Sequence, residues 1–221
     1  MKRFLWVFLT LLLFWAALGN FIFCTYRLRD TFSQTREQLI TIASNAALSI
    51  DAQELLEVPL QQTGDSSLTY RAIFDKLETI KQINPSLKYV YIMTTTDQPG
   101  ILQYVVDADP APQVITARSP SALPGDKYDA RALPEMLKAY GGPAADKKIT
   151  SDEWGSFISG YAPIRDSDGK SIAILGVDID AAGISALEKN VRVGGLLALA
   201  AFFIFLISLF GIFTFRSKNT A

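Results

Sequence analysis

The sequence predicts an α+β domain that lies between two apolar helices. Two observations point to this fold class. Charge-free apolar runs lie near both ends of the 221-residue chain, and between them two helical patterns precede most of the β-rich segments. Runs of helix combined with antiparallel hairpins are typical of α+β domains. The length between the apolar runs suits one domain with a single core.

The first apolar run covers residues 4–26 and is the first predicted transmembrane helix. It contains no charged residue and, as a helix, is long enough to span about 30 Å of hydrocarbon. The basic residues Lys2 and Arg3 and the small residues near Ala17 also fit a cleaved signal peptide. Because apolar residues continue through Phe23, we favour an uncleaved anchor, and in either case the domain is exported.

The second apolar run, residues 193–215, is the second predicted transmembrane helix and is followed by Arg216 and Lys218. Basic residues at both chain ends favour the cytoplasm, so we expect a two-pass protein of the inner (cytoplasmic) membrane. The domain then occupies residues 27–192 on the periplasmic or extracellular side. Residues 216–221 form a short cytoplasmic tail.

The residue inventory excludes several function classes. There is no histidine, which excludes Ser-His-Asp and Cys-His catalysis and histidine-ligated zinc. The single cysteine, Cys24, lies in the first apolar run, so no intramolecular disulfide can form. All acidic residues lie between Asp30 and Glu188, which argues against nucleic acid as a partner. We predict no enzyme activity, metal site or cofactor, because the spacing of the carboxylates demands none.

Two amphipathic helices are predicted at the start of the domain. Apolar residues recur at helical spacing over Leu28–Ala46, which predicts a long stalk helix, about 45 Å in length if it runs to Leu56. This stripe either packs against the domain's own sheet or forms the seam of a homodimer, and the two roles can coexist at different heights. After a polar break at Pro59–Ser67, a second helix is predicted over Leu68–Ile83.

Two hairpins supply the predicted strands. The first joins Tyr89–Thr96 to Ile101–Pro110 through a turn that contains Pro99 and Gly100. The second joins Gly155–Ile164 to Lys170–Asp180 and closes the sheet.

The segment between the hairpins predicts a lid. Ala111–Ala132 is rich in Pro, Ser, Gly and Asp, with at most a short strand near Val114–Ala117. Long irregular loops of this kind often cover functional sites. A short helix is expected next, over Leu133–Tyr140.

Four motifs follow one another along the domain: YVVDADP at 104–110, PGDKYDA at 124–130, PEML at 134–137 and DEWGSFISGYAPIRDSDGKSIAILGVDID at 152–180. Together they resemble the Cache-type, PAS-like extracytoplasmic sensor domains of bacterial transmembrane receptors. The resemblance covers roughly residues 35–189 and implies a central antiparallel sheet beside a long N-terminal helix, together with small-molecule sensing.

The chain departs from this family's usual organisation in one respect. Members of the family usually pass their signal through the second membrane helix to a kinase, cyclase or chemotaxis output domain. Here only residues 216–221 follow that helix, too few for a folded module. Either a signalling partner protein supplies the output through membrane-helix contacts, or the chain is a shortened receptor.

The candidate ligand-binding residues are polar and aromatic residues on strands that border the lid. Alternation along the second hairpin puts Ser159 and Asp178 on one face, so the two are expected to converge. Asp178 would be costly to bury without a partner such as a ligand amine, Arg or Lys; an internal salt bridge or cap is the alternative. The aromatic candidates also fit core positions. The predicted site comprises Tyr91, Asp107, Tyr128, Trp154, Ser159, Tyr161 and Asp178.

Two functions fit these patterns. The first is a membrane-anchored sensor of a small polar organic ligand, of the amino acid, carboxylate or amine class, whose pocket closure shifts the membrane helices. It predicts a concave, partly polar cavity under the lid. The alternative is a structural or assembly protein whose domain presents a partner-binding surface, which predicts a filled core.

Overall fold

The computed structural model describes residues 2–108, 122–152 and 155–218. These residues form two compact units, Gln34–Ala181 and a second one made of Met1–Ser33 with Ala182–Ala221, and each unit is described by itself. The predicted short strand near Val114–Ala117 lies outside the described residues.

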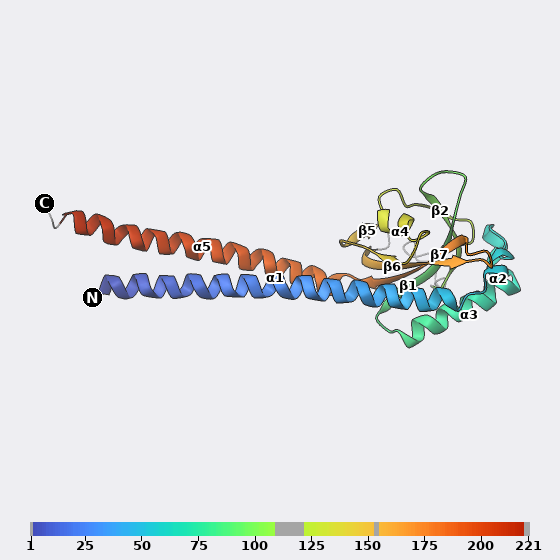
Figure 1. Cartoon of the computed structure of the whole chain (residues 1–221), viewed down its shortest axis with the longest axis horizontal. Coiled ribbons are helices and arrows are strands. Elements are labelled where there is room, and N and C mark those ends of the chain that lie inside the picture. The colour runs from blue at the N-terminus through green and yellow to red at the C-terminus, as the bar shows by residue number, and fades with distance from the viewer. Residues whose placement is uncertain (1, 109–121, 153–154, 219–221) are drawn as a thin grey trace. The chain divides into compact units, whose positions relative to one another are not determined.

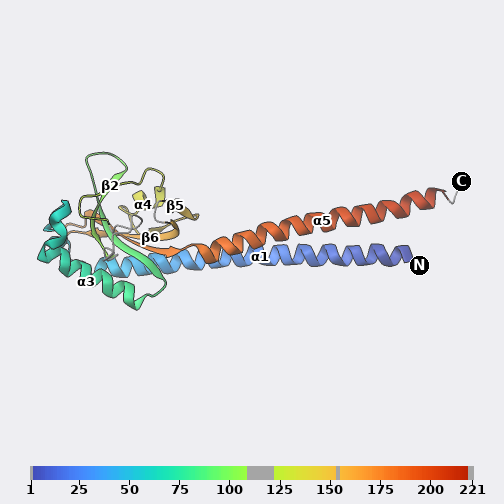
Figure 2. The ribbon, with the colours of Figure 1, turned by 180° about the vertical axis from the view of Figure 1, so that it is seen from behind.

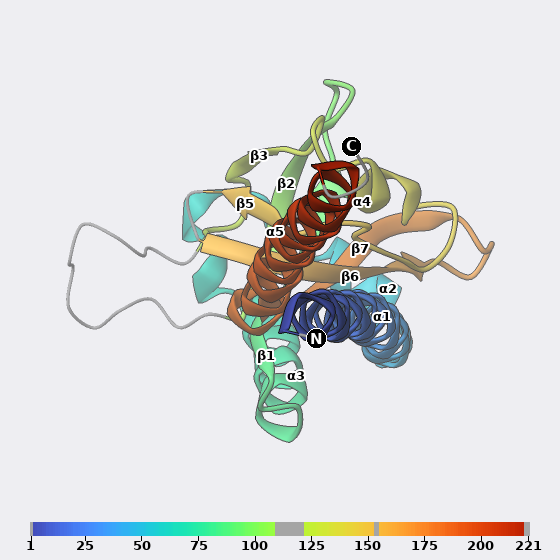
Figure 3. The same ribbon diagram turned by 90° about the vertical axis from the view of Figure 1, so that its left-hand side faces the viewer.

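The unit that contains both chain ends is helical. It consists of α1 (Lys2–Leu48), as far as Ser33, and α5 (Ala182–Lys218), which run side by side (Figures 1 and 3). Two segments, Phe4–Leu48 and Ala182–Gly211, have the length and composition needed to cross a membrane, with hydropathies of 2.2 and 2.6.

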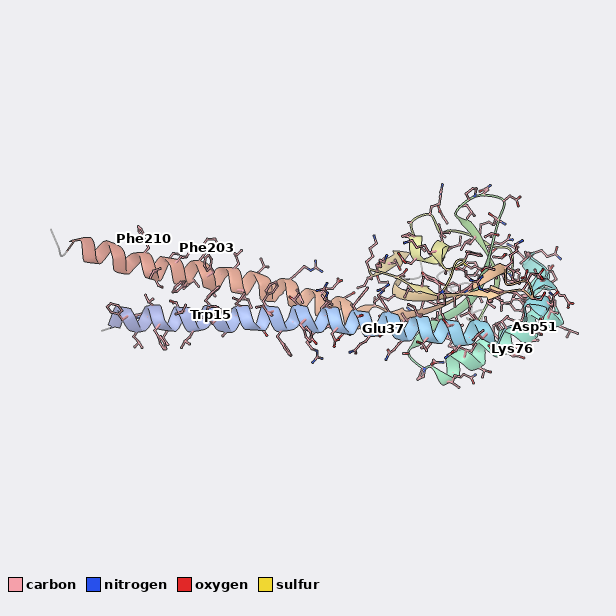
Figure 4. All side chains as sticks on the ribbon, viewed as in Figure 1. Trp15, Glu37, Asp51, Lys76, Phe203 and Phe210 are labelled. Carbon is pink, nitrogen blue, oxygen red and sulfur yellow. The ribbon has the colours of Figure 1, made fainter. Side chains whose placement is uncertain are left out.

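Aromatic side chains hold this helix pair together. The ring of Phe14 on α1 has its centroid 5.4 Å from that of Phe202 and 6.4 Å from that of Phe205, both on α5. Other large apolar side chains of the same helices point outward and are exposed, among them Trp15, Phe203 and Phe210 (Figure 4).

The second unit is built on a seven-stranded antiparallel sheet. Its strand order is β3-β2-β1-β7-β6-β4, and β5 also pairs with β6. The central strands are rich in β-branched and aromatic residues and are buried on both faces, as expected for strands covered on two sides. The strands are β1 (Leu87–Thr95), β2 (Ile101–Asp107), β3 (Lys127–Asp129), β4 (Ala144–Ala145), β5 (Thr150–Asp152), β6 (Gly155–Arg165) and β7 (Ser171–Asp180).

Helices cover one face of this sheet. The part of α1 that follows Gln34 and the helix α3 (Leu68–Ile83) lie on that face (Figures 1 and 2). The buried residues recur at helical spacing, which explains why these segments fold as amphipathic helices. They are Leu39, Ala43, Ala46 and Ala47 on α1, and Tyr70, Ile73 and Leu77 on α3.

Helix α1 comes very close to the sheet at Gly160 of β6. A Cβ atom placed there would come within 2.6 Å of Leu39 Cβ and 2.7 Å of the Leu39 carbonyl carbon. Because backbone atoms cannot yield as a side-chain end can, α1 reaches this depth only over a glycine.

Three short helices complete the unit: α2 (Ala52–Leu56), the 3-10 helix η1 (Gln62–Ser66) and α4 (Pro134–Lys138). Asp51 caps α2 by accepting hydrogen bonds from the backbone N–H groups of Gln53 and Glu54.

The predicted fold class is confirmed, with a central antiparallel sheet, a long N-terminal helix and an apolar C-terminal helix. The two hairpins and the helix over Leu68–Ile83 are also found, and the stripe residues Leu39 and Ala46 are buried inside the domain. A homodimer through the stalk stays a prediction.

The structure refines the prediction in several places. The stalk helix does not reach Leu56, because α1 ends at Leu48 and Asp51 caps a new helix. The polar break at Pro59–Ser67 contains the 3-10 helix η1. The helix predicted over Leu133–Tyr140 is shorter in the structure: α4 begins at Pro134, a residue that suits the first turn of a helix, and ends at Lys138. Strands β3, β4 and β5 were not predicted, since segments of two or three residues carry no readable alternation.

Candidate ligand-binding site

The sheet face opposite α1 and α3 carries a cluster dominated by tyrosines, which we call the tyrosine face. It includes parts of β1, β2, β6 and β7, with α4 and the segment from Ala122 to Ala130 packed on them. Its buried members are Tyr91, Met93, Leu102, Tyr104, Ala122, Ala130, Met136, Ala139, Tyr161 and Ile174, and Tyr89, Tyr128 and Tyr140 pack against them.

Strand register brings the candidate polar residues to this face. Asp107 of β2 pairs with Tyr91 of β1, and Ser159 of β6 pairs directly with Asp178 of β7. Residues that face each other across antiparallel strands project to the same side, so Ser159 and Asp178 converge as the alternation predicted, and Tyr91 and Asp107 also share one side. Tyr161 follows Ser159 on the same side, two residues along β6.

Asp178 is buried beside Tyr91. The Tyr91 hydroxyl donates a hydrogen bond to Asp178 Oδ1 at 3.2 Å. The Tyr91 ring packs against Gly176, where a Cβ atom would come within 2.4 Å of the ring. The glycine therefore sets the position of the tyrosine that holds Asp178, an arrangement that any side chain at position 176 would displace.

Asp107 connects the sheet to the segment that begins at Ala122. Its Oδ2 accepts a hydrogen bond from the backbone N–H of Ala122 at 3.1 Å, and its backbone carbonyl accepts one from the Tyr70 hydroxyl at 3.4 Å. Asp107 therefore contacts α3 on one side of the sheet and the chain near Ala122 on the other.

A third buried acid, Asp146, escaped the sequence analysis. Its Oδ1 accepts a hydrogen bond from the Tyr161 hydroxyl at 3.3 Å. Its Oδ2 accepts bonds from the backbone N–H of Ser159 at 3.2 Å and from Thr150 Oγ1 at 3.3 Å. Asp146 follows the two-residue strand β4, too short for its pairing with β6 to show as a sequence pattern.

Aromatic rings extend the site beyond the carboxylates. Tyr91 and Tyr104 meet edge to face with centroids 5.9 Å apart, and Tyr104 meets Tyr128 in the same way at 6.2 Å. Tyr89 and Phe157 form a third such pair at 5.3 Å. Edge-to-face contacts of this kind fix the orientation of the rings.

Burial keeps the tyrosines in their neutral, hydrogen-bond-donating form. Burial raises the pKa of Tyr91 well above its ordinary value of 10, and the Asp178 carboxylate adds to the rise. Burial likewise raises the pKa of Tyr161, with further contributions from Asp146 and Asp178. Burial raises the pKa of Tyr70 to about 12.

The buried charges have one sign. Among the residues that the structure describes, the buried polar or charged ones are four acids and one serine, and none is a lysine or arginine. They are Asp107, Glu135, Asp146, Ser159 and Asp178. Glu135 is neutralised locally, because Lys138 and Lys147 contact it at 3.0 and 3.1 Å. Within the same described ranges no group of three metal-binding side chains occurs.

The structure thus brings six of the seven predicted site residues to one face. The seventh, Trp154, lies outside the described residues, as does half of the predicted lid, so the cavity expected under that lid stays a prediction.

Comparisons with known proteins bear on the fold. No protein-family model matches the sequence, and no curated protein matches it. Among solved structures, the sensor domain of the V. cholerae histidine kinase DctB matches with a TM-score of 0.51 and 12% identity, over 79% of this chain and 58% of that one.

Two further structures are similar at lower scores. The ligand-binding domain of the Campylobacter jejuni chemoreceptor Tlp3, in complex with L-valine, has a TM-score of 0.46 and 15% identity over 78% of this chain and 62% of that one. The E. coli DcuS sensor domain has a TM-score of 0.47 and 13% identity over 74% and 98%.

The fold is therefore that of the Cache-type, PAS-like sensor domains, as the sequence motifs indicated. At these identities the likeness concerns the fold alone. This chain spans 62% of the length of the Tlp3 domain and 58% of the DctB domain.

Proposed function

We propose that the protein is a membrane-anchored sensor that binds a small organic ligand on the tyrosine face and passes ligand occupancy on through its two apolar helices. The observation that carries this proposal is the convergence of Asp107, Ser159, Tyr161 and Asp178 with Tyr91 on one face of a sensor-type fold. These residues come from four strands, so the cluster is a product of the tertiary fold. A few polar groups among aromatic walls are typical of small-molecule sites.

The charge of the face favours a ligand that carries an ammonium group. Every buried charged residue in the described parts of the chain is an acid, and Asp178 lies within hydrogen-bonding distance of a tyrosine hydroxyl. An ammonium group would form a charge-assisted hydrogen bond with the carboxylate and could lie against a tyrosine ring. An amine or an amino acid, bound through its ammonium end, therefore fits better than a carboxylate without one.

The membrane role is supported by the two helices that are apolar enough to span a bilayer. In this account they anchor the chain in the inner membrane and hold the domain on the outer side. A ligand that closes the site would change the relative positions of the helices, and a partner protein or a further module would read that change.

One observation favours the alternative, a structural protein that presents a surface to a partner. Within the described residues, every buried side-chain nitrogen or oxygen has a hydrogen-bonding partner. A filled core, in which the buried polar groups bond to one another and no ligand is needed, would show the same complete set of hydrogen bonds. The test below therefore has to separate the two functions.

A thermal-shift screen of the full-length protein in detergent tests the proposal. The panel contains amines, amino acids, carboxylates without an amine, and purines. We expect ammonium-bearing compounds to raise the melting temperature saturably, by about 5 °C or more at a hundredfold excess over Kd. Carboxylates without an amine are expected to give no shift.

Two variants locate the effect. Asp178→Asn should abolish the shift because it removes the charge that binds the ammonium group. Tyr140→Phe is the matched control, because its hydroxyl donates to the Met93 carbonyl at 3.4 Å and has no contact with Asp178. No shift with any compound, or an equal shift in Asp178→Asn, would favour the structural alternative or another site.

A further inference from the structure

The residue Asp146 contacts both the tyrosine face and the stalk helix. We propose that it is a positioning residue that couples Tyr161 and Ser159 mechanically to Arg36 on α1. The inference rests on the proposed function only in treating Tyr161 as a ligand-facing residue; the coupling itself is a property of the ligand-free protein.

On the sheet side, Asp146 is held from several directions. Its carboxylate accepts hydrogen bonds from the Tyr161 hydroxyl and the Ser159 N–H, and its own N–H donates to the Ser159 carbonyl at 2.9 Å. Thr150 supplies a further bond to the carboxylate. The Asp146 side chain is only 3% exposed, so the position of the Tyr161 hydroxyl and that of Asp146 are fixed together.

On the helix side, the guanidinium of Arg36 donates hydrogen bonds to the backbone of the same residue and of its neighbour. Arg36 Nε donates to the Asp146 carbonyl at 2.8 Å, and Nη2 donates to the Ala145 carbonyl at 3.1 Å. A planar guanidinium that binds two successive carbonyls fixes direction as well as distance. Arg36 lies on α1, so a displacement of Asp146 is transmitted to that helix.

A second contact makes the link stiff. Gly160 lies between Ser159 and Tyr161 on β6, and its Cα faces Leu39 on α1 at close range. The three residues therefore alternate: two project to the tyrosine face and the one between them touches the helix. Arg36 and Leu39 are three residues apart, on the same side of α1.

Asp146 thus links the site to an element that runs, as one helix, from Lys2 to Leu48. A ligand that draws the Tyr161 hydroxyl away from Asp146 would weaken the hydrogen bonds from Arg36 to the Ala145 and Asp146 carbonyls. Ligand binding and the packing of α1 on the sheet would then depend on the same chain of hydrogen bonds, from Tyr161 through Asp146 to Arg36.

Hydrogen exchange on the full-length, ligand-free protein in nanodiscs tests this coupling. The variants are Tyr161→Phe, Arg36→Gln and the double variant, with Tyr140→Phe as the matched control. The readout is the exchange rate of α1 amides in peptides from Gln34 to Ala47. Arg36→Lys replaces Arg36→Gln if the latter does not fold, because lysine keeps the charge but cannot bind two carbonyls in a fixed fork.

We expect Tyr161→Phe to speed exchange in this part of α1 by about two- to tenfold, the range for one lost hydrogen bond. Tyr140→Phe should leave α1 unchanged although it removes a hydroxyl from the same face. The double variant should exchange no faster than Arg36→Gln, because both changes break one path.

The inference is overturned if Tyr161→Phe alters exchange only in β6 and β4, or if the effects of the two single variants multiply in the double variant. Neither result touches the ligand screen, since no ligand is present. A failed screen would equally leave this coupling standing.

Discussion

At the scale of single residues, the glycine at position 160 decides how deeply α1 docks. We expect Gly160→Ala to destabilise the domain by about 1–3 kcal/mol, because the added Cβ meets the backbone of Leu39 and forces the helix outward. Gly142→Ala is the matched control, since a Cβ there would meet nothing within 4 Å. Melting temperatures of the full-length protein measure both, and equal values for the two variants would contradict the contact.

The buried carboxyl of Asp146 makes stability depend on pH. Burial raises its pKa above the ordinary value of 3.8, although the bonds from Ser159, Thr150 and Tyr161 act in the opposite direction. A raised pKa in the folded state means that the stability contributed by this group is present below pH 3.8 and is lost as the pH rises through the folded-state pKa. The advantage of wild type over Asp146→Asn should therefore grow as the pH falls from 7 to 4.

Asp129 provides a control of opposite sign. The side chain of Arg131 lowers the pKa of Asp129 to about 2, so its contribution is present above the unfolded-state value and is lost as the pH falls through the folded-state pKa. The advantage of wild type over Asp129→Asn should therefore shrink when the titration of melting temperatures is extended below pH 4, and only slightly, because the pair is exposed. The same trend in both variants would show that Asp146 is not the group responsible.

Residue-scale prediction from the sequence succeeded where alternation applies. Ser159 and Asp178 lie in long strands, so their common face could be read from a period of two. Asp146 could not be found in this way, because its neighbours form a strand of two residues and its partners on β6, Ser159 and Tyr161, lie 13 and 15 residues away.

At the scale of elements, capping determines where the helices of the domain begin. Ser67 caps α3, because its hydroxyl accepts a hydrogen bond from the backbone N–H of Tyr70 at 3.1 Å. We expect Ser67→Ala to lower the free energy of unfolding by about 1 kcal/mol. The adjacent Ser66→Ala removes a hydroxyl without removing the cap and should cost less than about 0.5 kcal/mol. Denaturant titrations of both variants measure the difference, and equal costs would contradict the cap.

The end of α1 and the start of α2 could have been predicted from the sequence. Asp51 is followed three residues later by Glu54, a pattern typical of a helix start, and the structure shows Asp51 accepting bonds from two N–H groups. The apolar periodicity continued across this point and concealed it. Long hairpins and amphipathic helices were predicted because their patterns repeat over many residues, whereas β3, β4 and β5 depend on tertiary pairing alone.

At the scale of the whole molecule, the two apolar helices predict which parts of the chain face each side of the membrane. We expect a membrane-impermeant maleimide to label Asp168→Cys in intact cells whose outer envelope is permeable, because Asp168 lies in the exposed turn between β6 and β7. Ser217→Cys, beyond the second apolar segment, should react only after the inner membrane is opened. The natural Cys24 is replaced by serine in both variants to remove background.

The opposite labelling pattern would place the domain in the cytoplasm and remove the extracytoplasmic role. Labelling of both positions in intact cells would show that the second helix does not span the membrane. The expected labelling pattern follows from the sequence alone, from two long apolar runs without charged residues and the basic residues that flank them. Insertion into a bilayer depends on composition more than on tertiary contacts.

The central claim is that a ligand binds at Asp178 on the tyrosine face. Calorimetric titration of the full-length protein with the most stabilising compound of the screen tests it most directly, with wild type compared with Asp178→Asn. We predict that the substitution weakens binding by about tenfold or more, because it removes the charge that pairs with the ammonium group. Equal Kd values for the two proteins, both folded, would contradict the assignment of the site.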